Sequence, residues 1–69
     1  MAVFVWVYFD AEGRQAGRSE RFEDQVEAEA WMGERWSALR DDGMETVALR
    51  DEAANRDVYR MGLSEEPEA

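Results

Sequence analysis

The sequence predicts a small α+β domain, a two-layer sandwich in which one helix packs on one face of a four-stranded antiparallel sheet. Residues 2–9 are apolar throughout and rich in β-branched and aromatic side chains, which is typical of a strand. Residues 24–41 have a helix start signal and good helix formers, and two short strand patterns follow them. The order is therefore ββαββ, and a right-handed crossover over the first strand gives the spatial order 2-1-3-4.

The first strand pair is predicted from residues 2–21. Because residues 2–9 are apolar on both faces, we expect this strand in the interior of the sheet. Residues 10–13 have the composition of a turn, with Gly13 suited to a left-handed conformation. Residues 14–21 are mostly polar and contain three arginines, so any strand there lies at an edge.

The helix is predicted over residues 24–41. Asp24 followed by Glu27 resembles a capping box, and Gly43 has the chemistry of a C-terminal cap. At 100° per residue one narrow apolar stripe forms, flanked by two tryptophans, and the opposite side faces water. The stripe contains Ala28, Met32 and Leu39, the flanking residues are Trp31 and Trp36, and the water-facing residues are Glu27, Glu29, Ala30, Gly33 and Glu34.

The second strand pair follows the helix. Residues 44–50 alternate, with Val47 and Leu49 on one face and Thr46, Ala48 and Arg50 on the other, as in a half-buried strand. A polar connection then leads to a closing strand at 57–61. We expect one domain over residues 1–63 and a disordered acidic tail over residues 64–69.

Composition excludes several classes of function. The chain has 69 residues, a net charge of −9, and no His, Cys or Lys, so it lacks an imidazole, a thiolate and an amine nucleophile. The negative charge disfavours nucleic acid and anionic membranes, and no apolar run is long enough to span a bilayer. We expect no enzyme activity, no cofactor and no metal, and a cytoplasmic location. The all-arginine composition favours a G+C-rich bacterial genome.

The predicted function is protein interaction through the face of the sheet that the helix leaves open. The hypothesis places the valines of the first strand under the helix and Phe4, Trp6 and Tyr8 on the open face, where Tyr59 and Met61, or Val58, enlarge the patch. Three aromatic side chains form a patch of roughly 450–750 Å², which is large for a soluble monomer. A homodimer or a partner protein would cover it.

Four alternatives stay open. Phe4 and Trp6 can instead lie in the core, with the valines half exposed. The acidic helix exterior (Glu27, Glu29, Glu34) suggests a decoy that occupies the basic, DNA-binding surface of another protein. Arg35 falls within the apolar stripe, where it either extends to water or contacts an anion or a partner carboxylate. The fourth alternative is a small-ligand cavity lined by Trp31, Trp36 and Arg35. Two acidic clusters are expected to be solvated turns and not metal sites. The first is Asp10 and Glu12, and the second is Asp41, Asp42 and Glu45.

Overall fold

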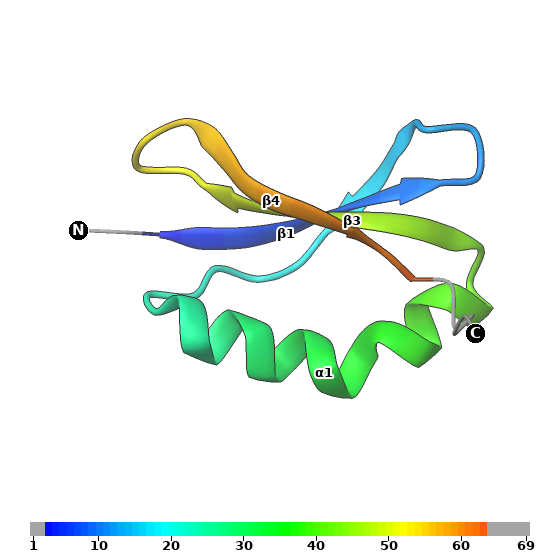
Figure 1. The fold of residues 1–69 in the computed structure, drawn as a ribbon, viewed down its shortest axis with the longest axis horizontal. Helices are drawn as coiled ribbons and strands as arrows, with labels where there is room; N and C mark the ends of the chain where they lie inside the picture. Colours follow the sequence, from blue (N-terminus) through cyan, green and yellow to red (C-terminus); the bar gives the residue numbers. More distant parts are fainter. Residues whose placement is uncertain (1–2, 64–69) are drawn as a thin grey trace.

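The computed structural model describes residues 3–63 and contains the predicted elements in the predicted order (Figure 1). The elements are β1 (Phe4–Asp10), β2 (Gln15–Arg18), α1 (Gln25–Asp41), β3 (Met44–Asp51) and β4 (Arg56–Gly62). All strand pairs are antiparallel, and the sheet order is β2-β1-β3-β4. The fold class and the interior position of β1 are therefore confirmed. The expected acidic tail, 64–69, lies outside the described residues.

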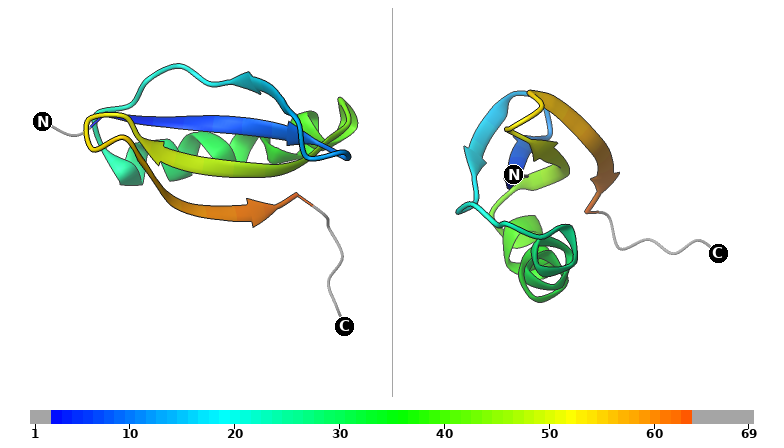
Figure 2. Two further views of the ribbon diagram at one scale, coloured as in Figure 1. Left: turned by 90° about the horizontal axis from the view of Figure 1, so that it is seen from above. Right: turned by 90° about the vertical axis from the view of Figure 1, so that its left-hand side faces the viewer.

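The helix lies along one face of the twisted sheet, and no element within residues 3–63 covers the opposite face (Figures 1 and 2). Asp24 is the N-cap, as predicted, but its carboxylate accepts a hydrogen bond from the amide of Val26 at 3.0 Å and not from that of Glu27. Gly43 follows the C-cap with φ 97°, and its amide donates to the carbonyl of Arg40. This conformation favours glycine, because a Cβ atom is strained there.

Turn residues fix both hairpins. The Asp10 carboxylate accepts hydrogen bonds from the amides of Glu12 and Arg14 at 2.9 and 3.0 Å, and Gly13 has φ 82° as predicted. In the second hairpin the Asp51 carboxylate accepts from two following amides, and Asn55 adopts φ 58°. Aspartate and asparagine favour such turns because their short side chains bond to the local backbone.

The core lies between α1 and the sheet face that carries the aromatic side chains of β1. Trp6 is completely buried at 0% exposure, and Phe4 and Tyr8 are partly buried against the same cluster. The prediction that these three residues occupy the open face is therefore wrong. The alternative that places Trp6 in the core, with Phe4 packed against it, is confirmed. Its other part, half-exposed valines, is wrong for Val5 and Val7, which are 1% and 7% exposed.

The physical reason is the size of the helix residues above the strand. Ala28 lies in the first turn of α1 on its inner face and is fully buried, so it leaves room for a large side chain opposite. The Trp6 indole fills that room, and its Nε1 donates a hydrogen bond to the Ala28 carbonyl at 2.8 Å. Valines in this position would leave a void, which protein interiors avoid. Trp31 and Trp36 occupy the helix flanks and do not cover the centre.

Two core residues lie outside the predicted strands and helix. Phe22 precedes the helix, is 6% exposed, and exchanges two backbone hydrogen bonds of 2.7 Å with Phe4. Its ring packs on that of Trp31, with the centroids 5.6 Å apart. Leu63 directly follows β4 and is 2% exposed. Each is an isolated apolar residue among polar neighbours, and that isolation is the signal in the sequence that could have indicated burial.

Candidate functional site

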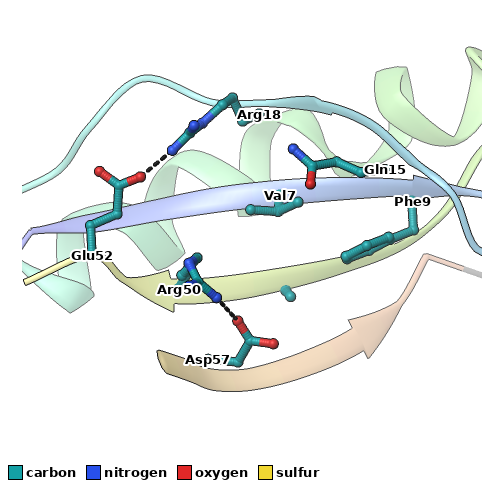
Figure 3. Close-up of a pocket in the computed structure, with 8 residues that line it drawn as sticks. Val7, Phe9, Gln15, Arg18, Arg50, Glu52 and Asp57 are labelled. Carbon is teal, nitrogen blue, oxygen red and sulfur yellow. Dashed lines mark hydrogen bonds and ion pairs between the residues drawn. The ribbon is translucent and has the colours of Figure 1, made fainter. Parts of the chain in front are cut away.

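The open face of the sheet is covered by its own long polar side chains. Val5, Val7 and Ala48 point to this face, yet all three are buried. Charged and polar residues from the neighbouring strands and from the β3–β4 turn surround them and form a hollow of about 410 Å³ (Figure 3). Its lining, besides Val7 and Ala48, consists of Phe9, Gln15, Arg18, Arg50, Glu52 and Asp57. The aliphatic parts of such side chains can shield valines from water while the charged ends remain solvated.

Ion pairs connect these side chains across the face. Glu52 pairs with Arg18, and its other oxygen lies 3.4 Å from Nε of Arg21. Arg50 donates to Asp57 at 3.0 Å and to the side-chain oxygen of Asn55 at 2.6 Å. The face therefore balances its own charges and presents a polar surface to water, and the predicted aromatic surface is not there.

An apolar groove lies instead at the flank of the molecule, between α1 and β4. It encloses about 310 Å³. Its lining comes from the core (Trp6 and Met32), from α1 (Gly33 and Trp36) and from β4 (Tyr59 and Met61). Glu29 is the one charged residue of the lining. We call this site the α1–β4 groove.

The groove contains two of the three large exposed hydrophobic side chains among residues 3–63. Trp36 is 36% exposed and Met61 is 38% exposed, whereas the third, Val26, lies on the outer side of the helix. Two of the predicted interface residues, Tyr59 and Met61, thus border the groove. Val58 is partly buried against the core and is not part of the groove lining.

Glu29 and Tyr59 connect the helix to β4 along the groove. The Tyr59 hydroxyl donates to the Glu29 carboxylate at 2.9 Å, and Gln25 donates to the same oxygen at 3.1 Å. These hydrogen bonds, that of Gln25 first, lower the pKa of Glu29. Burial, together with the bond to the carboxylate, raises the pKa of Tyr59 to about 12. At neutral pH the groove therefore holds a carboxylate anion and a neutral phenol.

Trp31 and Trp36 do not line a common cavity. Trp31 packs on Phe22 at the β2 side of the helix, whereas Trp36 faces the groove at the β4 side. The Arg35 guanidinium lies over the Trp31 ring at 5.5 Å from its centroid and is exposed. Arg35 thus extends along an aromatic ring to water. Two residues of the predicted ligand cavity, Trp31 and Arg35, are therefore in contact, but Trp36 lies in a different site.

The carboxylates singled out on the helix do not form one cluster. On the helix, Glu27 and Glu34 share one flank, and Glu29 faces Tyr59 on the other. Asp10 caps its own turn. Residues 3–63 contain no group of three or more carboxylates that could hold a metal ion.

Comparisons of the chain with protein-family models, with curated proteins and with solved structures find no match. Within residues 3–63, α1 is neither long nor apolar enough to cross a membrane.

Proposed function

We propose that the protein is a small non-catalytic interaction module that docks a second protein chain, a copy of itself or a different protein, along the α1–β4 groove. The observation that carries this proposal is that two exposed apolar side chains, Trp36 and Met61, line one groove whose lining includes core residues. Tryptophan and methionine are enriched at protein interfaces, and tryptophan is prominent among the residues that dominate binding energy.

The position of the groove beside an edge strand adds support. β4 is the last strand in the sheet order, so one side of its backbone has no neighbouring strand among residues 3–63. An open strand edge with adjacent apolar pockets is the arrangement that accepts an extended chain from a partner. The other edge strand, β2, has only four residues, whereas β4 has seven, and so β2 offers a shorter template.

A photo-crosslinking amino acid placed at position 61 tests the proposal. We expect it to form a discrete adduct, with a second copy in the purified protein or with another protein in an extract of the source cells. The same amino acid at position 26 is the matched control, because Val26 is 73% exposed and lies on the outer side of the helix. Equal labelling at the two positions, or no discrete adduct at position 61, contradicts the proposal.

The acidic-decoy hypothesis receives less support from the geometry. Glu27 and Glu34 are seven residues apart, which corresponds to a rise of about 10.5 Å along the helix. One DNA strand carries a charge about every 3.4 Å along the helix axis, so this row of carboxylates is about three times sparser than a phosphate backbone. Glu29 on the opposite flank does not extend the row.

A further inference from the structure

The outer edge of β4 presents backbone groups at alternate residues. This edge meets no other strand among residues 3–63 (Figure 2). The Leu63 amide donates to the Glu45 carbonyl of β3 at 2.9 Å, and no register shift separates this contact from Arg60. In an antiparallel pair, residues that bond to the neighbouring strand alternate with residues that do not. Met61 therefore bonds to β3, whereas the N–H and C=O groups of Arg60 and Gly62 point away from the sheet.

These outward backbone groups are self-complementary about a two-fold axis at Met61. If two β4 edges pair antiparallel with Met61 opposite its own copy, Arg60 lies opposite the partner's Gly62, and Gly62 lies opposite the partner's Arg60. Each of these pairs can exchange both of its N–H···O bonds. A register with Arg60 on the axis would instead place two guanidinium groups directly opposite each other, which is unfavourable. Because Gly62 has no side chain, the axis at Met61 leaves the Arg60 guanidinium without a like charge opposite.

The same axis joins the exposed apolar side chains of the two grooves. Met61 is 38% exposed and lies on the helix side of β4, opposite the buried Val47. At a pair that exchanges no hydrogen bonds the Cα atoms are about 4.5 Å apart, so the two Met61 side chains are in contact. Tyr59 and Trp36, which line the groove together with Met61, then border the same seam. Pairing of the edges therefore buries apolar surface as well as backbone groups.

The positions of the charges permit this pairing. Because α1 packs over β1 and β3, two helices on one continuous sheet lie about four strand spacings apart, roughly 19 Å. This distance exceeds the screening length of about 8 Å at physiological salt, so repulsion between the two acidic helices is largely screened. Glu27 and Glu34 lie on the flank of α1 that is turned away from β4. The flank at the groove carries one charge of each sign, Glu29 and Arg40, and Arg40 stacks on Trp36.

We infer that the partner in the groove is a second copy of the chain, paired edge to edge through β4, so that two sheets become one continuous sheet with both helices on the same face. This inference rests on the proposed function and names the partner. The two-fold axis closes the assembly, so association stops at a dimer. Because the paired stretch is short, the interface is small, and we expect a dissociation constant of about 0.1 mM.

Single-cysteine variants test the pairing and its register, because the chain contains no cysteine. Met61→Cys places two thiols on paired residues whose Cα atoms are about 4.5 Å apart, within the range that a disulfide requires. Arg60→Cys is the register control, because two copies of residue 60 are offset by two positions along the strands and their Cα atoms lie about 8 Å apart. Val26→Cys, on the outer side of the helix, reports random collision. We expect Met61→Cys to oxidise to a dimer at least tenfold faster than either control.

Hydrogen exchange and a proline variant test the backbone bonds. The amides of Arg60 and Gly62 should become protected as the protein concentration rises from about 10 μM to about 1 mM, whereas the Met61 amide is protected throughout. Gly62→Pro removes an outward donor and leaves the bonds to β3 in place, so it should weaken dimerisation at least tenfold. Gly62→Ala is the matched control. It keeps the donor, and its Cβ atom would meet only the Glu45 carbonyl oxygen, at 3.9 Å, so it should dimerise like the wild type.

Sedimentation equilibrium of the full chain gives the deciding mass. A chain that stays monomeric up to about 1 mM overturns the inference. Oxidation of Met61→Cys no faster than the controls, or no concentration-dependent protection at Arg60 and Gly62, overturns it as well. If the purified chain is monomeric and the crosslinker at position 61 joins it to a different protein, the proposed function stands and the second copy is rejected. If that crosslinker forms no discrete adduct, the proposed function itself fails.

Discussion

Replacing Trp6 tests which face of β1 lies under the helix. The side chain is fully buried, its Nε1 bonds to the carbonyl of Ala28, and its ring meets that of Tyr59 edge-on with centroids 6.0 Å apart. Truncating a buried Trp costs about 3–5 kcal/mol, and Trp6→Glu in addition buries a carboxylate without a partner. A domain of this size has a total unfolding free energy of about 3–10 kcal/mol. We therefore expect Trp6→Glu to be largely unfolded in the absence of denaturant.

Trp6→Phe gives a graded measurement of the same contacts. The lost indole hydrogen bond costs about 0.5–1.5 kcal/mol, and the smaller ring leaves a void that costs about 1 kcal/mol more. With a urea dependence of about 1 kcal/mol per molar, the unfolding midpoint should fall by about 1–3 M. Fluorescence of Trp31 and Trp36, together with far-ultraviolet circular dichroism, follows the transition.

Trp36→Glu is the matched control, because it makes the same chemical change at a side chain that is 36% exposed. We expect it to lower the unfolding free energy by about 1 kcal/mol or less and to leave the helical signal unchanged. If Trp6→Glu instead unfolds cooperatively at the wild-type midpoint, the aromatic side chains of β1 are not in the core, and the assignment of the two faces is wrong.

Three further predictions concern the open face, the groove and the helix end. Glu52→Gln should lower the unfolding free energy by about 0.5–1 kcal/mol at low salt and by less in concentrated salt, since its ion pairs are partly exposed; a loss independent of salt contradicts this. Folding raises the pKa of Tyr59 to about 12, so the contribution of this side chain to stability is complete below pH 10 and is lost as pH rises through 12. Tyr59→Phe should remove the phenolate transition with the highest pKa in an absorbance titration. If that transition survives, it does not belong to Tyr59. Gly43→Ala should cost about 1 kcal/mol because of its positive φ, and Gly33→Ala should gain about 0.5–1 kcal/mol within the helix; thermal midpoints that move in the same direction would refute this explanation.

Much of the fold follows from local features of the sequence. The apolar run at 2–9 required an interior strand, and β1 lies between β2 and β3. Asp24 and Gly43 marked the ends of α1 within one residue, because capping depends on short-range backbone chemistry. The strand order followed from the handedness of the crossover.

The orientation of β1 could not be predicted from its own residues. Both faces of the strand are apolar, so alternation gives no preference. The decision depends on Ala28, a small residue on a different element, which leaves space for the Trp6 indole. Such a choice depends on complementary volumes across the layer interface.

The position of the exposed apolar surface could not be predicted for a related reason. One helix does leave the opposite face of the sheet uncovered, but charged and polar side chains of the sheet itself shield the apolar residues there. Pairing of Glu52 with Arg18 joins residues 34 apart in the chain, so it becomes visible only once the strand register is known. The exposed apolar surface lies instead at the helix flank, where Trp36 and Met61 line one groove.

The central pairing of β1 with β3 has a consequence for how the chain folds. Each hairpin joins strands that are close in sequence, but the seam between the hairpins joins Phe4 to Asp51 and Asp10 to Met44. The two hairpins, β1–β2 and β3–β4, contact each other only through their central strands, β1 and β3. The helix lies within the segment between the two hairpins, so pairing of β1 with β3 closes a loop that contains all of α1. Such non-local contacts carry an entropic cost of loop closure and slow folding.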